Sequence, residues 1–552
     1  MNSSTRAQSR RQRTGILPAA LAALGLFGGS PGTCLASRIV YLAEQDIAFV
    51  NELYLVDLSA PGATTRLNRP MLPWSSGVSR FVVSPDGASV AYSADQDVAG
   101  DLDLYLVDLA MPGTWTRLGS LPAGRNELFA RFSPDGARIA FTASDEFFGN
   151  TQLYLVDLAD PGTATRLNPD LIANGSVSIS GFAFTPDGGS VVYVAAQDQQ
   201  LFDLYVVDLT TPGISARLNS TGGSVGDHWD GRFRITPDGT RVVYSAVGDL
   251  PGVRELQTVS LARPGVVTTL NSPMQAAGDV FDFTLSPDGR FAAYTADQDI
   301  DFLPEIFVVD LALPGVATKV SSQVHFGAGL ARFTPDSRSV VFTADQGRAP
   351  GERDLYLAAI GSPGESLRLN APLEQNMSVA QYAFSPGGTQ IAYLTEPIGG
   401  FTKDVMLVDL ASPGKAVKVN GPLPNGALES LQPRFSPDSD EIAFLAVESL
   451  ADSIQELFFA DLSEPGVSIR LNEALPPEAI VSPVPDSFAF LPVGAPAAGP
   501  APPKGFEPES SGGGAASLLL TLLLLLTWRW RSRRESGGFG PRQDARHRSA
   551  MR

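Results

Sequence analysis

Hydrophobic residues occur along this chain in short runs that turn signals interrupt at regular intervals. Residues 80–119 contain four such runs: Arg80–Val83, Ser89–Ser93, Leu104–Leu109 and Thr114–Leu118. The first two are separated by Pro85-Asp86-Gly87 and the last two by Pro112-Gly113. Because proline presets φ and glycine accepts positive φ, these pairs are typical of tight turns. The pattern predicts four short antiparallel strands joined by hairpins.

The third run of each unit is apolar throughout instead of alternating between apolar and polar residues. Examples are Leu53–Val56, Leu153–Val156, Leu204–Val207 and Ile306–Val309. A strand of this kind has both faces covered. A sheet packed between two similar sheets provides that cover, whereas a two-layer sandwich leaves one face in water.

The unit repeats along most of the chain. Its clearest marker is a Ser/Thr-Pro-Asp-Gly turn, with prolines at Pro85, Pro134, Pro186, Pro237, Pro287, Pro335, Pro386 and Pro437. Successive prolines are 48 to 52 residues apart. A period near 50 that is built from short strands predicts a circular or stacked array of repeats.

The repeat resembles a known family of modules. Arg131–Phe141, followed by Leu153–Leu158, is similar to the TolB-type, WD40-like propeller repeat, and the similarity extends over residues 38–492. Departures occur where Gly387 replaces the turn aspartate, Ser337 and Ser439 replace the turn glycine, and Val259-Ser260 replaces Val-Asp. The resemblance implies a periplasmic or secreted binding scaffold, in a family that also includes propellers fused to serine peptidases.

Counting strands predicts an all-β fold, a single propeller of nine four-stranded blades. Eight complete units run from Arg80 to Asn472, and Arg38–Asn68 supplies the second, third and fourth strands of another. Ala479–Val481 and Pro485–Ser487 resemble a first strand and its turn, so we expect N- and C-terminal strands to close the ring. Because nine exceeds the usual four to eight, eight blades are the alternative.

Composition restricts the classes of function. The chain carries a formal charge of −19, and with basic segments at both ends residues 38–511 carry about −29. A body this acidic repels phosphates, which disfavours nucleic acid as a partner. Cys34 is the only cysteine, and His228, His325 and His547 are the only histidines. We therefore expect no disulfide, thiolate metal site or multi-histidine site in the repeats, and no cofactor apart from a possible Ca²⁺ site.

The first 37 residues predict a secretory signal peptide. Arg6, Arg10, Arg11 and Arg13 precede an apolar run, Ile16–Phe27, and small residues follow up to Ser37. A twin-arginine signal at Arg10-Arg11 and lipidation at Cys34 are the alternatives.

The C-terminal end predicts a stalk and a membrane-directed segment. Residues 493–511 are rich in Pro, Ala and Gly, and residues 512–552 combine Gly512–Gly514, an apolar run (515–527) and an arginine-rich tail. This order resembles the GlyGly-type sorting signals of Gram-negative bacteria, which implies a sorting protease of the rhomboid type. A plain single-span anchor is the alternative. Both place the repeats outside the cytoplasm, in the outer envelope, at the cell surface or in the medium.

Acidic residues recur in the loop that follows the second strand of each unit. They are Glu44, Asp46, Asp95, Asp97, Asp145, Glu146, Asp198, Asp249, Asp297, Asp299, Asp345, Glu396 and Glu448. In a propeller these loops share one face, so their carboxylates could bind Ca²⁺ or a basic partner. The alternative is structural, because such side chains also close turns by accepting hydrogen bonds from their own backbone.

Other candidate chemistry is weak. Gly222–Gly226 matches the Gly-x-Ser-x-Gly pattern and lies near His228, but that motif requires a strand-to-helix turn that this all-β sequence does not predict. We therefore expect a non-catalytic scaffold that binds a protein or another envelope macromolecule. A propeller hydrolase or lyase that uses paired carboxylates, and a structural array stabilised by cations, are the alternatives.

Overall fold

The computed structural model describes residues 37–492 with gaps. The described ranges are 37–72, 74–119, 126–144, 150–220, 224–225, 233–247, 252–275, 278–400, 404–422, 433–447, 454–476, 479–482 and 486–492. Contacts divide the chain into residues 1–36 and 37–552, and every described residue belongs to the second unit. Cys34, the stalk and the C-terminal segment lie outside the described residues, as does the expected signal peptide up to Ala36.

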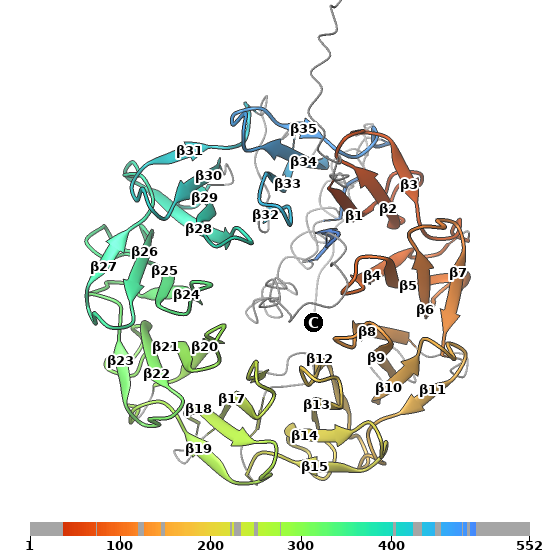
Figure 1. Cartoon of the computed structure of the whole chain (residues 1–552), viewed down its shortest axis with the longest axis horizontal. Coiled ribbons are helices and arrows are strands. Elements are labelled where there is room, and N and C mark those ends of the chain that lie inside the picture. The colour runs from red at the N-terminus through yellow and green to blue at the C-terminus, as the bar shows by residue number, and fades with distance from the viewer. Residues whose placement is uncertain are drawn as a thin grey trace, which may run out of the picture. The chain divides into compact units, whose positions relative to one another are not determined.

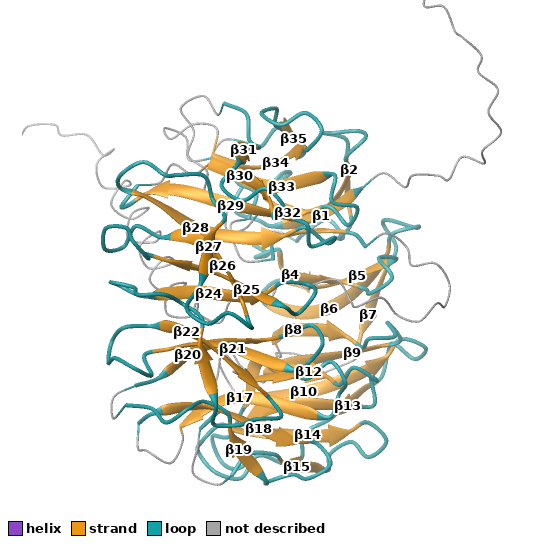
Figure 2. Ribbon diagram, turned by 60° about the vertical axis from the view of Figure 1, so that its left-hand side comes forward, coloured by secondary structure: helices purple, strands orange, loops and turns teal. Residues whose placement is uncertain are grey.

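The described residues form nine four-stranded antiparallel sheets that are arranged as blades in a ring (Figure 1). This confirms the predicted nine-bladed propeller. Every regular element in the described part of the chain is a strand (Figure 2).

We number the blades in chain order. Blade 1 contains β36 (Phe488–Phe490), β1 (Arg38–Ala43), β2 (Glu52–Asp57) and β3 (Thr64–Arg66). Blade 2 contains β4 (Val78–Val83), β5 (Ser89–Val98), β6 (Asp101–Asp108) and β7 (Trp115–Leu118). Blade 3 contains β8 (Asn126–Phe132), β9 (Arg138–Ser144), β10 (Thr151–Asp157) and β11 (Ala164–Arg166). Blade 4 contains β12 (Val177–Phe184), β13 (Ser190–Ala195), β14 (Asp203–Asp208) and β15 (Ser215–Arg217). Blade 5 contains β16 (Phe233–Ile235), β17 (Arg241–Val247), β18 (Arg254–Ser260) and β19 (Val267–Thr269).

Four further blades complete the ring. Blade 6 contains β20 (Val280–Leu285), β21 (Phe291–Ala296), β22 (Glu305–Asp310) and β23 (Ala317–Lys319). Blade 7 contains β24 (Ala328–Phe333), β25 (Ser339–Ala344), β26 (Asp354–Ala359) and β27 (Ser366–Arg368). Blade 8 contains β28 (Met377–Phe384), β29 (Gln390–Pro397), β30 (Asp404–Asp409) and β31 (Ala416–Lys418). Blade 9 contains β32 (Arg434–Phe435), β33 (Glu441–Val447), β34 (Gln455–Asp461) and β35 (Ile469–Arg470).

The hydrophobic core lies between neighbouring blades. One buried cluster joins Val40 and Leu53 of blade 1 to Val90 and Tyr105 of blade 2. Strands such as β2 are buried over almost their whole length, as the continuous apolar runs predict. Each blade therefore has two buried faces and depends on the blade on either side.

The Pro-Asp-Gly turns are held by a repeated set of hydrogen bonds. In blade 2 the Ser84 hydroxyl donates to Asp86 Oδ1 over 2.5 Å, and the Ala88 amide donates to the same oxygen over 3.0 Å. Gly87 has a φ of 69°, and Ser439, which replaces the turn glycine in blade 9, has a φ of 70°. These contacts support the structural role predicted for the turn.

The turn aspartates predict acid sensitivity. The hydroxyls of Ser133 and Thr185 hold the carboxyl pKa values of Asp135 and Asp187 below the usual range. A lowered folded-state pKa stabilises the fold above the unfolded value, near 4, and this stabilisation is lost as the pH falls through the folded pKa. We expect the melting temperature to fall from pH 5 to pH 3, and the Asp135→Asn/Asp187→Asn variant to lose part of that dependence.

Glu52→Gln tests the opposite sign in the same titration. Burial raises the pKa of the Glu52 carboxyl, so its ionisation destabilises the fold as the pH rises. Protonation of Glu52 therefore stabilises the fold as the pH falls, and the Glu52→Gln variant, which lacks this contribution, should lose stability in acid more steeply than the wild type. If calorimetry gave parallel curves for both variants and the wild type, these carboxyls would have no part in the acid response.

The turns between third and fourth strands connect neighbouring blades at the outer rim. Five of these turns donate their glycine amide to a carbonyl that follows the fourth strand of the preceding blade: Gly213 to Leu167, Gly265 to Leu218, Gly315 to Leu270, Gly414 to Leu369 and Gly466 to Val419. Gly62 makes the same bond to Leu471 across the two ends of the propeller, over 3.0 Å. The hydrogen bonds of the outer rim therefore continue between blade 9 and blade 1, where the two ends of the propeller meet.

The C-terminal strand closes the ring at a different place from the one predicted. β36 pairs with β1, with Phe488 opposite Tyr41 and Phe490 opposite Ile39. The predicted strand, Ala479–Val481, contributes only an isolated bridge from Val481 to Ala43. The closing strand therefore follows Asp486-Ser487, which had been predicted as the turn after it.

Candidate functional site: the loops between second and third strands

The predicted acidic loops contain a recurring acid-Gln-Asp motif whose three positions have different surroundings. The motif follows the aromatic residue of the second strand and is complete in blade 1 (Glu44–Asp46), blade 2 (Asp95–Asp97) and blade 6 (Asp297–Asp299). In blade 2 the motif lies within the extended strand β5 rather than in a loop.

The first position is buried and binds backbone amides. Asp95 accepts the amides of Ser76, Gly77 and Gly100 over 2.8, 2.9 and 3.0 Å. Burial alone would raise the carboxyl pKa of Asp95, but the hydrogen bonds from Ser75 and these amides outweigh burial and lower it. The carboxylate therefore holds its own loop against the connector from the preceding blade.

The same role recurs in other blades. Asp345 accepts the amides of His325 and Phe326 over 2.9 and 2.7 Å, and Asp297 accepts the Phe302 amide over 2.9 Å. Glu44 is buried and accepts the Phe49 amide over 2.9 Å. For these four residues the structure supports the structural alternative.

The central glutamine, which the sequence analysis did not single out, accepts a tyrosine hydroxyl from the second strand. Tyr193 donates to Gln197 Oε1 over 2.6 Å, and the Gln197 amide donates to Ser215 in the fourth strand over 3.0 Å. Tyr41 and Gln45 make the same bond over 2.8 Å. The signal in the sequence is a glutamine four residues after the tyrosine, repeated in several blades.

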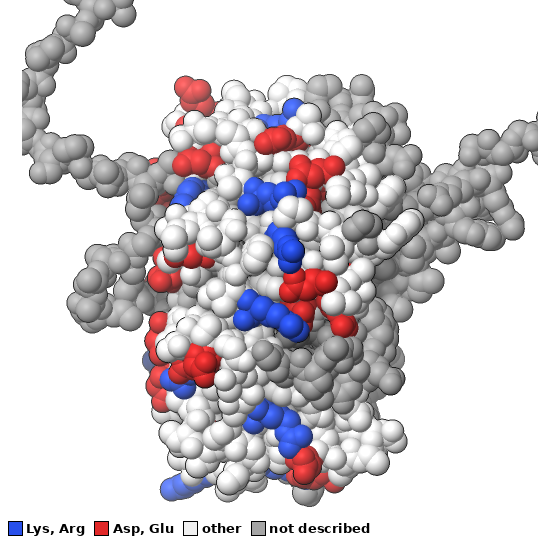
Figure 3. Space-filling view, turned by 90° about the vertical axis from the view of Figure 1, so that its right-hand side faces the viewer, with Lys and Arg blue, Asp and Glu red and all other residues white. Residues whose placement is uncertain are grey.

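The third position is exposed and pairs with a cation near the outer strand. The pairs are Asp46–Arg66 (2.6 Å), Asp97–Arg69 (2.9 Å), Asp198–Arg217 (3.3 Å) and Asp299–Lys319 (3.1 Å). Because the fourth strand is outermost in each blade (Figure 1), these carboxylates lie toward the rim instead of forming a ring around the channel. On the side of the ring shown in Figure 3, charges of both signs lie next to one another.

The remaining predicted acidic residues are placed as follows. Glu396 lies in β29, opposite Ser378 of β28. Asp145, Glu146, Asp249 and Glu448 lie outside the described residues. Among the residues that the structure describes, no group of three or more His, Cys, Asp or Glu could hold a metal ion, so Ca²⁺ binding stays a prediction.

A second set of carboxylates, also missed in the sequence, begins the third strands. They pair with a cation of the fourth strand: Glu52–Arg66, Asp103–Arg117, Asp203–Arg217, Glu305–Lys319, Asp354–Arg368, Asp404–Lys418 and Glu456–Arg470. In these seven blades the signal is an acidic residue near the start of the third strand and an Arg or Lys just before a Leu or Val, whereas blades 3 and 5 have Gln152 and Thr269 at one of the two positions. These pairs join the two outer strands of a blade.

Arginines of the innermost strands connect neighbouring blades. Arg131 lies over the ring of Phe182, Arg234 over Phe283 and Arg434 over Phe488, with guanidinium-to-centroid distances of 5.6, 5.9 and 5.2 Å. In each pair the ring belongs to the next blade. A cation over a ring face contributes about 0.5–2 kcal/mol, so these contacts stabilise the ring of blades.

The structure describes the other candidates of the sequence analysis only in part. His325 is exposed, and its backbone amide binds Asp345. Of Gly222–Gly226 only Ser224 and Val225 are described, and His228 is outside the described residues.

Comparisons with known proteins show similarity of fold. No protein-family model matches the chain, and no curated protein matches it in sequence. Among solved structures, a eukaryotic initiation factor aligns over 83% of this chain and 99% of its own, with a TM-score of 0.52 and 13% identity. A putative TolB from Agrobacterium tumefaciens aligns over 43% of this chain and 79% of its own, with a TM-score of 0.29 and 16% identity. At these identities the likeness shows the propeller architecture alone.

The described part of the chain has no helix that is long and apolar enough to cross a membrane. The predicted anchor, residues 515–527, lies outside it.

Proposed function

We propose that this propeller is a non-catalytic scaffold that binds a protein partner through the loops between its second and third strands. The observation that carries the proposal is the exposure of bulky apolar side chains beside the exposed aspartates. Phe49 and Phe302 follow the acidic motifs of blades 1 and 6 and are 49% and 84% exposed, and Trp74 in the next connector is 97% exposed.

All three of these residues also have an unfavourable backbone, and Trp74 has a φ of 72°. Phe49 and Phe302 have φ values of 67° and 62°, in the left-handed region that bulky residues rarely adopt. Their own amides bind the buried carboxylates of Glu44 and Asp297, which keeps the loop in this conformation. Strain that displays an aromatic ring to solvent is typical of binding loops.

The connectors between blades belong to the same surface. The Val78 amide donates to the Asn51 carbonyl, and the Ala328 amide donates to the Pro304 carbonyl, each over 2.7 Å. Each acidic loop is thereby joined to the connector that follows its blade. The surface therefore combines exposed aromatic rings with exposed carboxylates, which suits a partner with apolar and basic groups.

The ends of the sequence support a position outside the cytoplasm. The charged, apolar and small-residue order of Met1–Ser37 favours export, and the glycine-rich, apolar and arginine-rich order of residues 512–552 favours delivery to a membrane and processing by a sorting protease. An envelope extract is thus the appropriate source of partners.

Exchange of the exposed aspartates should weaken capture of the partner. The variant combines Asp46→Asn, Asp97→Asn, Asp198→Asn and Asp299→Asn, which keeps the buried motif positions intact. Four exposed charge contacts at a few tenths of a kcal/mol each predict about a tenfold loss of capture at low salt. The measurement is quantitative mass spectrometry of proteins retained from an envelope extract by the immobilised full-length chain.

A matched control places the same charge change at the opposite ends of the third strands. Asp157, Asp208, Asp409 and Asp461 are exposed, and each accepts the amide two residues further on, which asparagine can also accept. The control variant should retain the partners. Equal losses from both variants would mean that net charge, and not this face, determines capture.

A further inference from the structure

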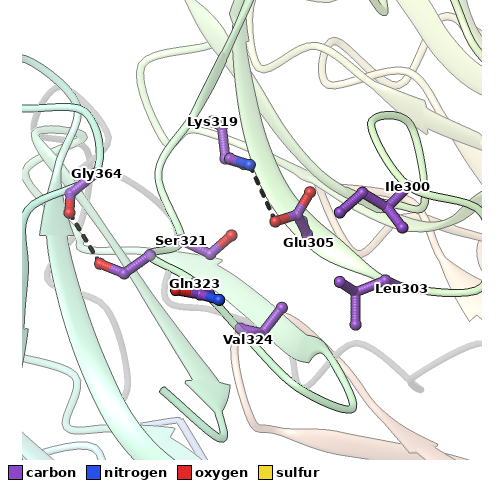
Figure 4. Close-up of a pocket in the computed structure, with 9 residues that line it drawn as sticks. Ile300, Leu303, Glu305, Lys319, Ser321, Gln323, Val324 and Gly364 are labelled. Carbon is purple, nitrogen blue, oxygen red and sulfur yellow. Dashed lines mark hydrogen bonds and ion pairs between the residues drawn. The ribbon is translucent and has the colours of Figure 1, made fainter. Parts of the chain in front are cut away.

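An indentation on the proposed binding face lies between blades 6 and 7 (Figure 4). It has a volume of about 460 Å³ and is bordered by the loop before β22, by β23 and by the connector that follows β23. Ile300, Leu303 and Val324 form an apolar wall, while Glu305 and Lys319 form the charged wall. The exposed ring of Phe302 belongs to the same loop.

Glu305 is an incompletely satisfied buried carboxylate. Its side chain is only 3% exposed, and Oε1 accepts Lys319 Nζ over 3.1 Å. Oε2 has no hydrogen-bond partner among the described residues. Leaving such an oxygen unpaired in a buried site is costly, so the pocket favours an incoming donor.

The equivalent site in blade 1 shows which donor can satisfy the second carboxylate oxygen. There Glu52 occupies the position of Glu305 and Arg66 that of Lys319, and the Tyr54 hydroxyl donates to Glu52 Oε2 over 3.0 Å. In blade 6 the corresponding residue is Phe307, which has no hydroxyl. The repeat itself thus identifies the missing donor.

The connector after blade 6 also differs from the one after blade 1. In the latter Arg69 lies over the Trp115 ring, 5.4 Å from its centroid, and pairs with Asp97. Ser322 and Ser366 stand at the corresponding positions of blades 6 and 7, and Ser322 borders the pocket. The arginine and tryptophan that pack together beside blade 1 are therefore replaced by small residues.

We propose that this pocket receives a lysine or arginine side chain of the partner, with its aliphatic part on Ile300, Leu303 and Val324 and its head group at Glu305. Two carboxylates, Asp299 and Glu305, share the single cation Lys319, so the site has one negative charge in excess. Lys319 bridges both and is 39% exposed, so it can remain with Asp299 while the incoming cation binds Glu305. The proposal rests on the proposed function and specifies the group recognised.

Two peptides that differ in a single head group provide the probe. Acetyl-Leu-Lys-Leu-amide and acetyl-Leu-norleucine-Leu-amide are titrated into the full-length chain, with binding followed by saturation-transfer NMR. The lysyl peptide should bind at least about tenfold more tightly, as expected for a charge-assisted hydrogen bond in a partly buried site. Equal binding of the two peptides would overturn the proposal.

Three substitutions localise the effect. Glu305→Gln should reduce binding of the lysyl peptide to that of the norleucyl peptide, while Glu52→Gln in blade 1 should leave it unchanged. Phe307→Tyr should weaken binding by supplying the hydroxyl that Tyr54 supplies in blade 1. Ser322→Arg, a half-exposed border position, should also block the pocket without altering Glu305. Unchanged binding in both Glu305→Gln and Ser322→Arg would contradict the assignment.

The result is separable from that of the proposed function. If the exposed-aspartate variant loses its envelope partners while the wild type does not discriminate between the peptides, the pocket proposal fails and the scaffold proposal stands. If the lysyl peptide binds at Glu305 but the aspartate and control variants retain partners equally, the pocket stands and the acidic loops are not its docking face.

Discussion

Phe488→Ala should destabilise the propeller by about 3–5 kcal/mol, as expected for truncating a buried aromatic residue. Phe488 is 4% exposed and contacts a cluster that includes Ile39 and Tyr41 of β1 and Leu457 of β34. It is also the ring over which Arg434 lies, so its removal weakens the contact between blades 9 and 1. Because β36 has only three residues, its pairing with β1 rests on few other contacts.

Urea unfolding and hydrogen exchange test this expectation together. The unfolding midpoint should fall, and the amides of Val40 and Leu42, which face β36, should exchange faster than those of β13 on the far side of the ring. Phe302→Ala is the matched control, because the same truncation at an exposed residue should change stability by less than about 0.5 kcal/mol. Equal shifts in the two variants would mean that β36 does not hold the ring closed.

The fold could be predicted because its determinants recur at fixed spacing. The Pro-Asp-Gly turns, the apolar third strands and the incomplete first unit gave nine blades, and the structure contains nine. Burial on both faces follows from continuous apolar runs, which do not depend on knowing which residues meet in space.

The closing strand was misplaced because two apolar segments compete for the role. Ala479–Val481 has the hydrophobicity of a strand, but the segment Phe488–Phe490 is followed by Pro492. Pro492 lies against Gly87 at the channel end of the first complete turn. Pro492 thus occupies the place that the turn proline of the preceding blade occupies elsewhere in the ring. This equivalence can be recognised only once blade 1 is placed next to blade 2 in space.

The acidic loops show the limit of a repeated motif. Spacing identified the carboxylates correctly as a recurring set. It did not reveal that Asp95 is buried and accepts backbone amides, while Asp97 is exposed and pairs with Arg69. Neighbouring residues of an extended segment point in opposite directions, so two acids in one motif can have unrelated roles. The pocket at Glu305 depends on Phe307, which the sequence shows only as one residue of an apolar third strand. Its importance follows from the hydrogen bond that Tyr54 donates to Glu52 at the same position of blade 1.

Gly388→Ala should destabilise the propeller by about 2–5 kcal/mol, more than the same change at the turn glycine Gly136. Gly388 has a φ of 68°, which costs alanine about 1–2 kcal/mol. A Cβ at this position would lie 2.5 Å from Cγ of Pro335, the turn proline of the preceding blade. Because a proline ring adjusts little, the clash should add about 1–3 kcal/mol by forcing the two turns apart.

Gly136→Ala separates the two contributions. Gly136 is the turn glycine of blade 3 and has a φ of 71°, but its Cβ would lie 3.7 Å from Pro85 Cδ, an ordinary contact. This variant should therefore show the backbone cost alone, about 1–2 kcal/mol in urea unfolding. A larger loss for Gly388→Ala would show that contacts between successive Pro-Asp-Gly turns help to hold neighbouring blades in register. Identical losses would restrict the turns to shaping their own hairpins.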